Sequence, residues 1–237
     1  MGLENRVAAI MGAAGGLGRV VSRALAEQGA RLALFGTNAE RLNELARELR
    51  LPDDSVLTGA LDLADPEAAR RSAAAVLDQF GRVDILLHLV GGWAGGTPVA
   101  DLAAHVVDDM LQQHLWTTLH VAQAFVAPLK ANGWGRIIVV SSPSAANPPA
   151  KGAPYSIGKA AQEALILTLA EELKGTGVTA NVLRVRAIDA QHERDRDRSP
   201  RTAAWTTPEE IAAAILYLCS DEARMVNGAR IPLYGSP

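Results

Sequence analysis

Short apolar runs alternate with longer stretches of helical periodicity along the whole chain. The strand-like runs are residues 6–11, 31–35, 55–63, 83–90, 135–142, 177–185 and 229–234. Between them, apolar residues recur at helical spacing, as they do over 39–50. Strands that alternate with helices in this way form a mostly parallel sheet with helices on both faces. The sequence therefore predicts one doubly wound α/β domain over residues 1–237, with about seven strands.

The ends of several helices are marked by capping residues. The stretch 65–81 begins with an aspartate and a proline and ends on a glycine, which is the order that helix ends prefer. The last helix is expected to begin at the capped sequence TPEE, from residue 207. A long helical region is expected from about 101 to 130, and a further helix contains Tyr155 and Lys159.

Composition and charge exclude several classes of protein. The formal net charge is −3, and no block of like charge suggests a surface for nucleic acid or acidic lipid. The longest apolar run is too short to span a bilayer and no secretory signal is visible, so a cytoplasmic protein is expected. The lone Cys219 excludes an intrachain disulfide and lies in an apolar run, which predicts a buried, inert thiol. The histidines show no spacing typical of a metal site.

The loop after the first strand is rich in glycine. Gly12, Gly16 and Gly18 form the pattern G-x-x-x-G-x-G before a helix of about 16–28. Such glycines let the chain turn sharply, let a pyrophosphate approach the backbone, and let the helix pack close to the strand. The helix N-terminus adds unpaired N–H groups and a partial positive charge, which favour an anion. The loop predicts a dinucleotide site, and a purely structural glycine turn is the alternative.

Tyr155 and Lys159 stand four residues apart in a run of small residues. On a helix, residues four apart share a face. An ammonium beside a phenol stabilises the phenolate and lowers the pKa of the tyrosine, so the phenol can act as a general acid or base nearer neutral pH. The alternative is a surface tyrosine with a solvated lysine.

The glycine loop, the LDL at 61–63, the paired serines at 141–142 and the Y-x-x-x-K of Tyr155 and Lys159 together resemble the classical short-chain dehydrogenase/reductase family. The resemblance extends over essentially the whole chain and implies a Rossmann fold with oxidoreductase activity. In that family the tyrosine exchanges a proton with the substrate oxygen, the lysine binds the nicotinamide ribose, and the serine hydrogen-bonds the substrate carbonyl. Carried over to this chain, these roles fall on Tyr155, Lys159 and Ser142.

The resemblance also implies which residues contact a nicotinamide dinucleotide. They are Gly12, Gly15, Gly16, Leu17, Gly18, Gly36, Thr37, Asn38, Asp62, Leu63, Gly91, Tyr155, Lys159 and Ile188. Members that prefer NAD carry an acidic residue at the end of the second strand, where this chain has Gly36 and Thr37. Thr37 and Asn38 offer hydrogen bonds to a 2′-phosphate, and Arg41 is close in sequence. NADP(H) is therefore the favoured cofactor, with NAD(H) as the alternative.

Three positions depart from the pattern of the family. Residues 88–91 read HLVG where the family has NNAG, and His88 is interpreted as a core histidine. Residues 185–186 read VR where the family has PG, and the sequence does not decide whether Arg186 points into the cleft or to solvent. The catalytic asparagine of the family aligns with His114.

His114 has two interpretations of equal weight. In the family the asparagine helps to hold a water that links the lysine to solvent, and an imidazole can donate and accept as well. Its ionisation near an ordinary pKa of about 6.5 would then remove the acceptor and give the rate of reduction an acid limb. In the second interpretation His114 is a passive replacement and the relay is weakened.

The sequence says less about the substrate-binding residues and about the oligomeric state. Trp93, Trp205 and a short lid at about 189–205 flank the expected substrate site, although the tryptophans can equally close a loop core. Alternating charges over 193–201 predict a solvated, mobile segment. Long apolar stretches in the helices that pair across a two-fold axis in the family favour a homodimer or homotetramer.

The leading hypothesis is therefore an NADP(H)-dependent carbonyl reductase or alcohol dehydrogenase with a small-molecule substrate. Hydride passes between the nicotinamide and the carbonyl carbon, while Tyr155 transfers the proton and Ser142 orients the oxygen. The second hypothesis, motivated by the three departures, is a cofactor-binding sensor or scaffold with little turnover. No metal, nucleic-acid or membrane partner is expected.

Overall fold

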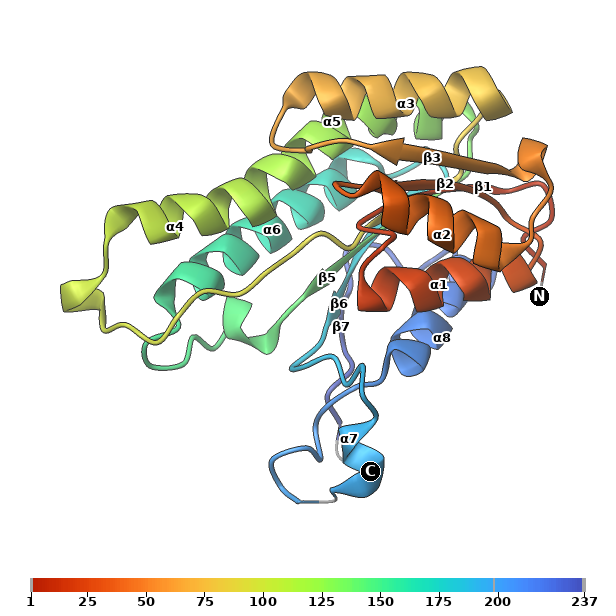
Figure 1. Ribbon diagram of the computed structural model, residues 1–237. Helices are drawn as coiled ribbons and strands as arrows, with labels where there is room; N and C mark the ends of the chain where they lie inside the picture. Colours follow the sequence, from red (N-terminus) through yellow and green to blue (C-terminus); the bar gives the residue numbers. More distant parts are fainter. Residues whose placement is uncertain (1, 198, 236–237) are drawn as a thin grey trace.

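Seven parallel strands form one sheet in the part of the chain that the structure describes, residues 2–197 and 199–235. The computed structural model orders them β3-β2-β1-β4-β5-β6-β7 across the sheet (Figure 1). The strands are β1 (Val7–Met11), β2 (Arg31–Gly36), β3 (Val56–Ala60), β4 (Ile85–His88), β5 (Gly135–Ser141), β6 (Val178–Arg184) and β7 (Arg230–Pro232). Each falls on a run predicted from the sequence, and most are shorter than predicted.

Helices cover both faces of the sheet (Figure 1). One cluster of buried side chains joins the sheet to α1 (Gly16–Glu27), α2 (Ala39–Leu49) and α8 (Pro208–Leu218). A second cluster joins the opposite face to α3 (Pro66–Phe80), α5 (Thr117–Ala131) and α6 (Ala153–Glu172). After β4 and β6, longer loops carry α4 (Ala104–Leu111) and α7 (Glu193–Arg196). The single doubly wound Rossmann domain predicted from the sequence is confirmed.

The alternation of side chains along β1 shows why both helical layers are required. Val7, Ala9 and Met11 belong to the cluster under α3, α5 and α6. Ala8 and Ile10 belong to the cluster under α1, α2 and α8. All five side chains are fully buried. A strand that is apolar on both faces is typical of a parallel sheet between two layers of helices.

The helix ends agree with the capping residues in the sequence. The Asp65 side chain accepts a hydrogen bond from the Glu67 N–H at the start of α3, and the helix ends at Gly81 with a left-handed φ of 73°. Thr207 and Glu210 form a reciprocal capping box at the start of α8. These bonds satisfy backbone groups that a helix end would otherwise leave unpaired.

The strand order reverses at β1. The chain moves outward from β1 to β2 and β3, and then returns to place β4 on the other side of β1. The connections that leave the carboxyl ends of β1 and β4 therefore diverge. Doubly wound proteins bind their ligands in the crevice at such a switch point.

The long helical region expected before β5 is interrupted. A π-helical turn, Gln112–Trp116, separates α4 from α5 and contains His114. The hydroxyls of Thr117 and Thr118 donate to the carbonyl oxygens of Gln113 and His114, at 2.6 and 2.5 Å. The apolar pattern continues across the turn, so helical periodicity does not reveal it. Turns of this kind are frequent at functional sites.

Gly158 lets α6 pack directly against α4 and the π-helical turn. A Cβ atom at this position would lie 2.8 Å from the Met110 carbonyl oxygen and 3.0 Å from His114 Cδ2. The first of these neighbours is backbone, which cannot yield without a shift of α4. The close approach brings His114 beside the part of α6 that carries Tyr155 and Lys159.

Replacing Gly158 with alanine should destabilise the protein. Alanine is favoured over glycine inside a helix by about 1 kcal/mol, but overpacking costs about 1–3 kcal/mol, and here the clash involves backbone. We expect a net loss of about 1 kcal/mol in the free energy of unfolding, measured by urea denaturation. Ala160→Gly, at an exposed position of the same helix, measures the propensity difference alone. A Gly158→Ala variant as stable as the wild type would show that α4 moves aside without cost.

Candidate active site

Two adjoining cavities lie at the switch point, beyond the carboxyl ends of β1 and β4. The first has a volume of about 560 Å³ and the second a volume of about 260 Å³. Leu89, Val90 and Gly91, which follow β4, line both cavities. Because the two cavities share this wall, together they form one site that is long enough for an extended ligand.

The glycine loop forms one wall of these cavities. Gly12 has a left-handed φ of 87°, and a Cβ atom on Gly18 would lie 2.3 Å from the Gly12 carbonyl oxygen, so neither position accepts a side chain. Gly12 and Gly15 line the first cavity and Leu17 lines the second, with Gly16 between them at the start of α1. No side chain caps α1 and its first turn carries no acidic residue. Its N–H groups and dipole are therefore available to an anion.

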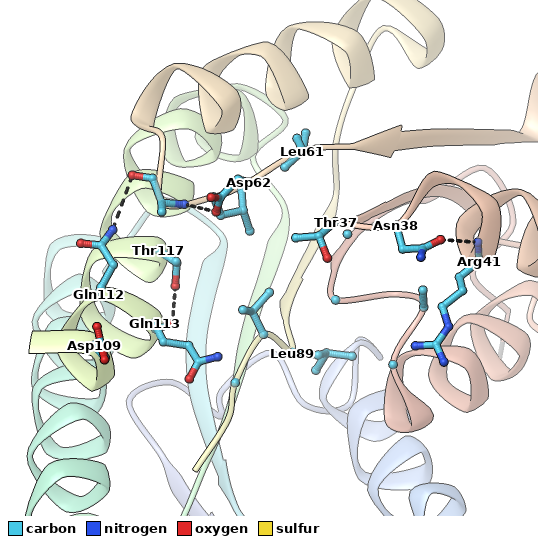
Figure 2. Close-up of a pocket in the computed structure, with 18 of the residues that line it drawn as sticks. Thr37, Asn38, Arg41, Leu61, Asp62, Leu89, Asp109, Gln112, Gln113 and Thr117 are labelled. Atoms are coloured by element: carbon cyan, nitrogen blue, oxygen red, sulfur yellow. Dashed lines mark hydrogen bonds between the residues drawn. The ribbon is translucent and has the colours of Figure 1, made fainter. Parts of the chain in front are cut away.

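One end of the first cavity is formed by residues that follow β2. Gly36, Thr37 and Asn38 line it, and Arg41 lines it from the first turn of α2 (Figure 2). The Asn38 side-chain oxygen caps α2 by accepting a hydrogen bond of 2.9 Å from the Arg41 N–H. The Asn38 amide and the Thr37 hydroxyl have no other hydrogen bond within the described residues, and residues 36–38, at the end of β2, include no carboxylate.

Another part of the first cavity is formed by residues that follow β3 and by the π-helical turn (Figure 2). Asp62 and Leu63 line it, as the resemblance implies, and Asp62 accepts a hydrogen bond of 2.9 Å from the Ala64 N–H. Asp109 and Gln112 also line it, and the sequence did not indicate them. They are placed there by the path of α4, which motif spacing does not encode.

The second cavity gathers the predicted catalytic residues. Tyr155, Lys159 and His114 line it, and Ser142 lies close enough to Tyr155 to oppose, in part, the rise that burial causes in the pKa of the phenol. The Ser142 oxygen also accepts hydrogen bonds from the Ser144 hydroxyl at 2.8 Å and from the Ser144 N–H at 3.3 Å. These bonds hold the Ser142 hydroxyl in place. The structure therefore brings together all four residues that the sequence singled out.

Lys159 is fixed by partners other than the phenol. Its ammonium donates to the Val140 carbonyl oxygen at 2.7 Å and to Gln162 Oε1 at 3.0 Å, and lies 5.9 Å from the centroid of the Tyr155 ring. Burial lowers the pKa of Lys159 to about 7, and the charge of Glu163 opposes this effect. Burial raises the pKa of Tyr155 above its ordinary value. The expectation that the pair would lower the tyrosine pKa is therefore wrong in this geometry.

His114 presents one ring nitrogen to the site. Its Nε2 lies 3.2 Å from the Gly92 carbonyl oxygen, which can only accept, so Nε2 carries the proton. Its Nδ1 is buried and has no hydrogen-bond partner within the described residues, and the ring meets Tyr155 edge to face with centroids 5.5 Å apart. Burial, reinforced by the charge of Lys159, lowers the pKa of His114 to about 3. The expectation that His114 ionises near pH 6.5 is wrong, because the ring is desolvated.

His88 and Cys219 lie in the core, as the sequence predicts. His88 is buried, and its Nε2 lies 3.1 Å from the Thr117 hydroxyl. Burial, together with the charges of Lys159 and His114, lowers the pKa of His88 to about 3. Burial raises the pKa of the Cys219 thiol to about 12. Both side chains are neutral near pH 7.

A buried carboxylate lies on the same helix as the catalytic pair. Glu163 accepts hydrogen bonds from the Ser141 hydroxyl at 2.7 Å, from Arg184 at 2.9 and 2.5 Å, and from Arg230 at 2.8 Å. The two guanidinium groups and the serine hold the pKa of Glu163 below its ordinary value, against the effect of burial. The sequence analysis missed this network. Its signal was available, since Glu163 is four residues beyond Lys159 and therefore shares its helical face.

Two loops beyond the second cavity are joined to each other. The Gly96 N–H donates to the Lys151 carbonyl oxygen at 2.8 Å, which ties the loop after β4 to the loop before α6. Trp93 is 69% exposed and closes no loop core. It is therefore an exposed surface side chain, and it is not among the residues that line the two cavities.

The segment 189–205 is held by hydrogen bonds rather than left free in solvent. The buried Asp189 carboxylate accepts from the N–H groups of Glu193 and Arg194. Arg194 in turn donates to the Trp205 carbonyl oxygen at 2.7 Å and to Glu210 at 2.6 Å. Trp205 is half-buried. Within this segment Arg198 lies outside the described residues.

The departures after β6 line the second cavity. Val185 is buried and its N–H donates to the Ser141 carbonyl oxygen at 2.9 Å. Arg186 and Ile188 also line the cavity, and both are exposed. Arg186 therefore borders the cleft and is also open to solvent.

Two other kinds of site are not found in residues 2–197 and 199–235. Within these ranges no three histidine, cysteine, aspartate or glutamate side chains are grouped so that they could hold a metal ion. In the same ranges no helix has both the length and the apolar character needed to cross a membrane.

Comparisons with known proteins agree with this geometry. Residues 6–200 match the short chain dehydrogenase family. D-threitol dehydrogenase of Mycolicibacterium smegmatis is 31% identical over 98% of this chain and 93% of its own length. The 1,6-dihydroxycyclohexa-2,4-diene-1-carboxylate dehydrogenase of Pseudomonas putida is 31% identical over 98% and 92% of the two chains. The crystal structure of L-sorbose reductase from Gluconobacter frateurii, complexed with NADPH and L-sorbose, has a TM-score of 0.87 at 26% identity and covers 100% of this chain and 98% of that one.

These relatives are named as dehydrogenases or a reductase, and each aligns along almost its whole length. They support an oxidoreductase role and a nicotinamide dinucleotide as the class of cofactor. Since the family match also extends over most of the sequence, this chain belongs to the short chain dehydrogenase family.

Proposed function

We propose that the protein transfers hydride between NADP(H) and a small-molecule carbonyl or alcohol. The observation that carries this proposal is that Tyr155, with Ser142 nearby, and Lys159 meet at the second cavity, directly beside the cavity formed by the glycine loop. A bound nicotinamide dinucleotide would supply or accept the hydride. The two-part cavity, the uncapped N-terminus of α1 and the positions closed to side chains at Gly12 and Gly18 fit such a group.

The residues that would hold the dinucleotide divide between the two cavities. The adenosine part would contact residues after β2 and β3, and the pyrophosphate would lie on the glycine loop. The nicotinamide part would reach Lys159 and Ile188 in the second cavity. The predicted set is Gly12, Gly15, Gly16, Leu17, Gly18, Gly36, Thr37, Asn38, Asp62, Leu63, Gly91, Tyr155, Lys159 and Ile188, and Arg41 is added to it because it lines the first cavity.

Tyr155 is suited to donate a proton to a carbonyl oxygen. Because burial raises its pKa, the phenol remains protonated near pH 7. Ser142 would orient the same substrate oxygen, and its position close to Tyr155 supports this role. Lys159, with a pKa of about 7, would exchange a proton or hold positive charge close to the site. This arrangement favours the reductive direction, which consumes the tyrosine proton.

His114 would act as a neutral acceptor beside this group. Its Nε2–H is committed to the Gly92 carbonyl oxygen, so Nδ1 is left to hold a water or a hydroxyl group. The lowered pKa keeps the ring neutral throughout the physiological range. The imidazole therefore offers the acceptor that the asparagine of the family would supply.

Three further expectations accompany this proposal. Segment 189–205 would act as a substrate lid, since it follows the wall of the second cavity formed by Arg186 and Ile188. The chain would form a homodimer or homotetramer, because Trp116 and Ile157 expose 44% and 43% of their surface on neighbouring elements. A cytoplasmic location is the third.

The competing hypothesis is a protein that binds the cofactor and signals its presence without turnover. A sensor requires the first cavity but has no need of a protonated phenol, an oriented serine and a buried lysine around the second. All three are assembled here. We therefore favour the enzyme.

Substituting Tyr155 with phenylalanine should abolish the proton transfer and leave the dinucleotide site intact. Positioned acid–base groups contribute about 10²–10⁴-fold to rate, so we expect kcat for reduction of ketones to fall by at least 100-fold. The dissociation constant of NADPH, measured by fluorescence titration, should remain close to that of the wild type. Tyr217→Phe on α8, where the ring is 47% exposed, is the matched control. A Tyr155→Phe enzyme that keeps most of its kcat would refute the mechanism.

NADPH should bind more tightly than NADH, because no carboxylate at the end of β2 repels the 2′-phosphate. Gly36→Asp should reverse the preference, with a change in the ratio of the two dissociation constants of about tenfold or more, equivalent to roughly 1.4 kcal/mol. A Cβ atom at Gly36 would meet only Leu42 at 3.7 Å, so the substitution fits without strain. Gly36→Asn, which has the same size without the charge, is the control. Equal or tighter binding of NADH by the wild type would contradict the preference.

The pH profile of kcat should show no ionisation of His114 near pH 6.5, because its pKa is about 3. His114→Asn should retain activity with the same profile, since the amide also offers an acceptor, whereas His114→Ala should lose activity at every pH. Activity in the alanine variant equal to that of the wild type would make His114 a bystander.

The same lowered pKa should appear in the stability of the protein. The unfolded state takes up a proton on His114 below about pH 6.5, whereas the folded state does not until about pH 3, so stability is lost as the pH falls between these values. At pH 5.5 the loss amounts to about 1.4 kcal/mol relative to pH 7.5. His114→Asn should reduce the acid-induced loss in the free energy of unfolding by this amount. Identical losses in the wild type and the variant would show that His114 titrates normally.

A further inference from the structure

The second cavity has an unbalanced charge. Among the described residues that line it, Lys159 and Arg186 are the cationic members, and none is an aspartate or a glutamate. His114 is neutral, because burial lowers its pKa to about 3. The wall of this cavity therefore has an excess of positive charge.

The carboxylates nearest in the fold are already committed. Glu163 is saturated by Ser141, Arg184 and Arg230. The Asp189 carboxylate accepts two backbone N–H groups. Neither group is free to neutralise a cation at the cavity wall.

Arg186 differs from four arginines of this region that form ion pairs. Arg184, Arg194, Arg201 and Arg230 each form an ion pair. Within the described residues no ion pair or side-chain hydrogen bond joins Arg186 to the rest of the protein, and its side chain is exposed. A guanidinium group presents several N–H donors in a fixed planar fork, which matches a carboxylate.

The backbone around Arg186 is nevertheless well fixed. On one side the Val185 N–H donates to the Ser141 carbonyl oxygen at 2.9 Å, and on the other the Ala187 carbonyl oxygen accepts from the Thr206 N–H at 3.0 Å. The Arg186 side chain thus has no partner within the described residues, whereas the backbone on both sides of it is held by hydrogen bonds. Such a side chain can reach a ligand at low cost in backbone order.

We propose that Arg186 binds the carboxylate of the substrate, so that the protein acts on carbonyl compounds that carry an acid group. The proposal rests on the function proposed above and specifies its substrate class as oxo acids and the corresponding hydroxy acids. The carbonyl lies at Tyr155 and Ser142, and the acid group pairs with the guanidinium at the cavity wall. A phosphate of the dinucleotide shares this chemistry, and the experiment separates the two sources.

The test compares oxo acids of increasing chain length with their methyl esters, using NADPH and the wild type, Arg186→Gln and Arg186→Lys proteins. Hydrogen bonds to charged groups contribute roughly 10- to 100-fold in affinity, so the wild type should prefer one acid over its ester by at least about tenfold in kcat/KM. In Arg186→Gln this ratio should collapse toward one, and Arg186→Lys should retain part of it. Arg224→Gln, an exposed arginine away from both cavities, controls for the loss of a charge.

Two results would overturn the inference while leaving the proposed function in place. One is a wild-type enzyme that reduces acids and esters equally well. The other is an Arg186→Gln enzyme in which acids and esters fall by the same factor while the dissociation constant of NADPH rises, since Arg186 would then serve the dinucleotide.

A binding measurement that does not depend on turnover tests the anion site even if the protein proves not to be an enzyme. Calorimetric titration of the protein–NADP⁺ complex, which cannot reduce a carbonyl, with the same acids and esters should show binding of an acid, weaker binding of its ester, and loss of that difference in Arg186→Gln. This result without turnover would support the anion site and refute the enzyme. Absence of any such difference in the wild type would refute the anion site.

Discussion

The buried carboxylate of Glu163 fixes α6 to the sheet at the point where the candidate catalytic residues lie. It connects the helix with Ser141 at the end of β5, Arg184 at the end of β6 and Arg230 on β7. A buried ion pair adds little net stability compared with well-packed apolar groups, although removal of one partner costs about 3–5 kcal/mol. The main effect of the network is therefore to fix the position of α6 on the sheet, and its net contribution to stability is small. Because Tyr155 lies two turns earlier on the same helix, its place at the second cavity depends on this attachment.

Burial around α6 sets the protonation states of the site. Desolvation disfavours a charged form, so it lowers the pKa of Lys159 to about 7 and that of His114 to about 3, and it raises the pKa of Tyr155. One physical cause thus gives a neutral acceptor, a protonated donor and a lysine poised near neutrality. The close packing at Gly158 matters for the same reason, because it lets α4 and the π-helical turn approach α6 and so buries the His114 ring.

The sequence predicted those parts of the fold that local chemistry determines. Apolar runs located the strands, capping residues such as Asp65 located helix ends, and the glycine loop and Tyr155 with Lys159 located the two halves of the site. It did not predict the π-helical turn, since the apolar periodicity continues through it. It gave the wrong direction for the tyrosine pKa, because the sequence spacing of Tyr155 and Lys159 says nothing of the partners that the ammonium finds in Val140 and Gln162.

The departures from the family pattern weigh against a passive scaffold once their surroundings are considered. His88 has become a core side chain paired with Thr117, and Val185 keeps the end of β6 attached to β5. Neither change opens the second cavity or breaks its wall. Lys159 is buried at this cavity, and burial lowers its pKa from 10.5 to about 7. This shift means that the charged form loses roughly 5 kcal/mol of stabilisation relative to the neutral form. A perturbed cation in a cleft, beside a phenol and an unpaired imidazole nitrogen, is typical of a catalytic site. A site used only for binding would have no use for a lysine held in that state.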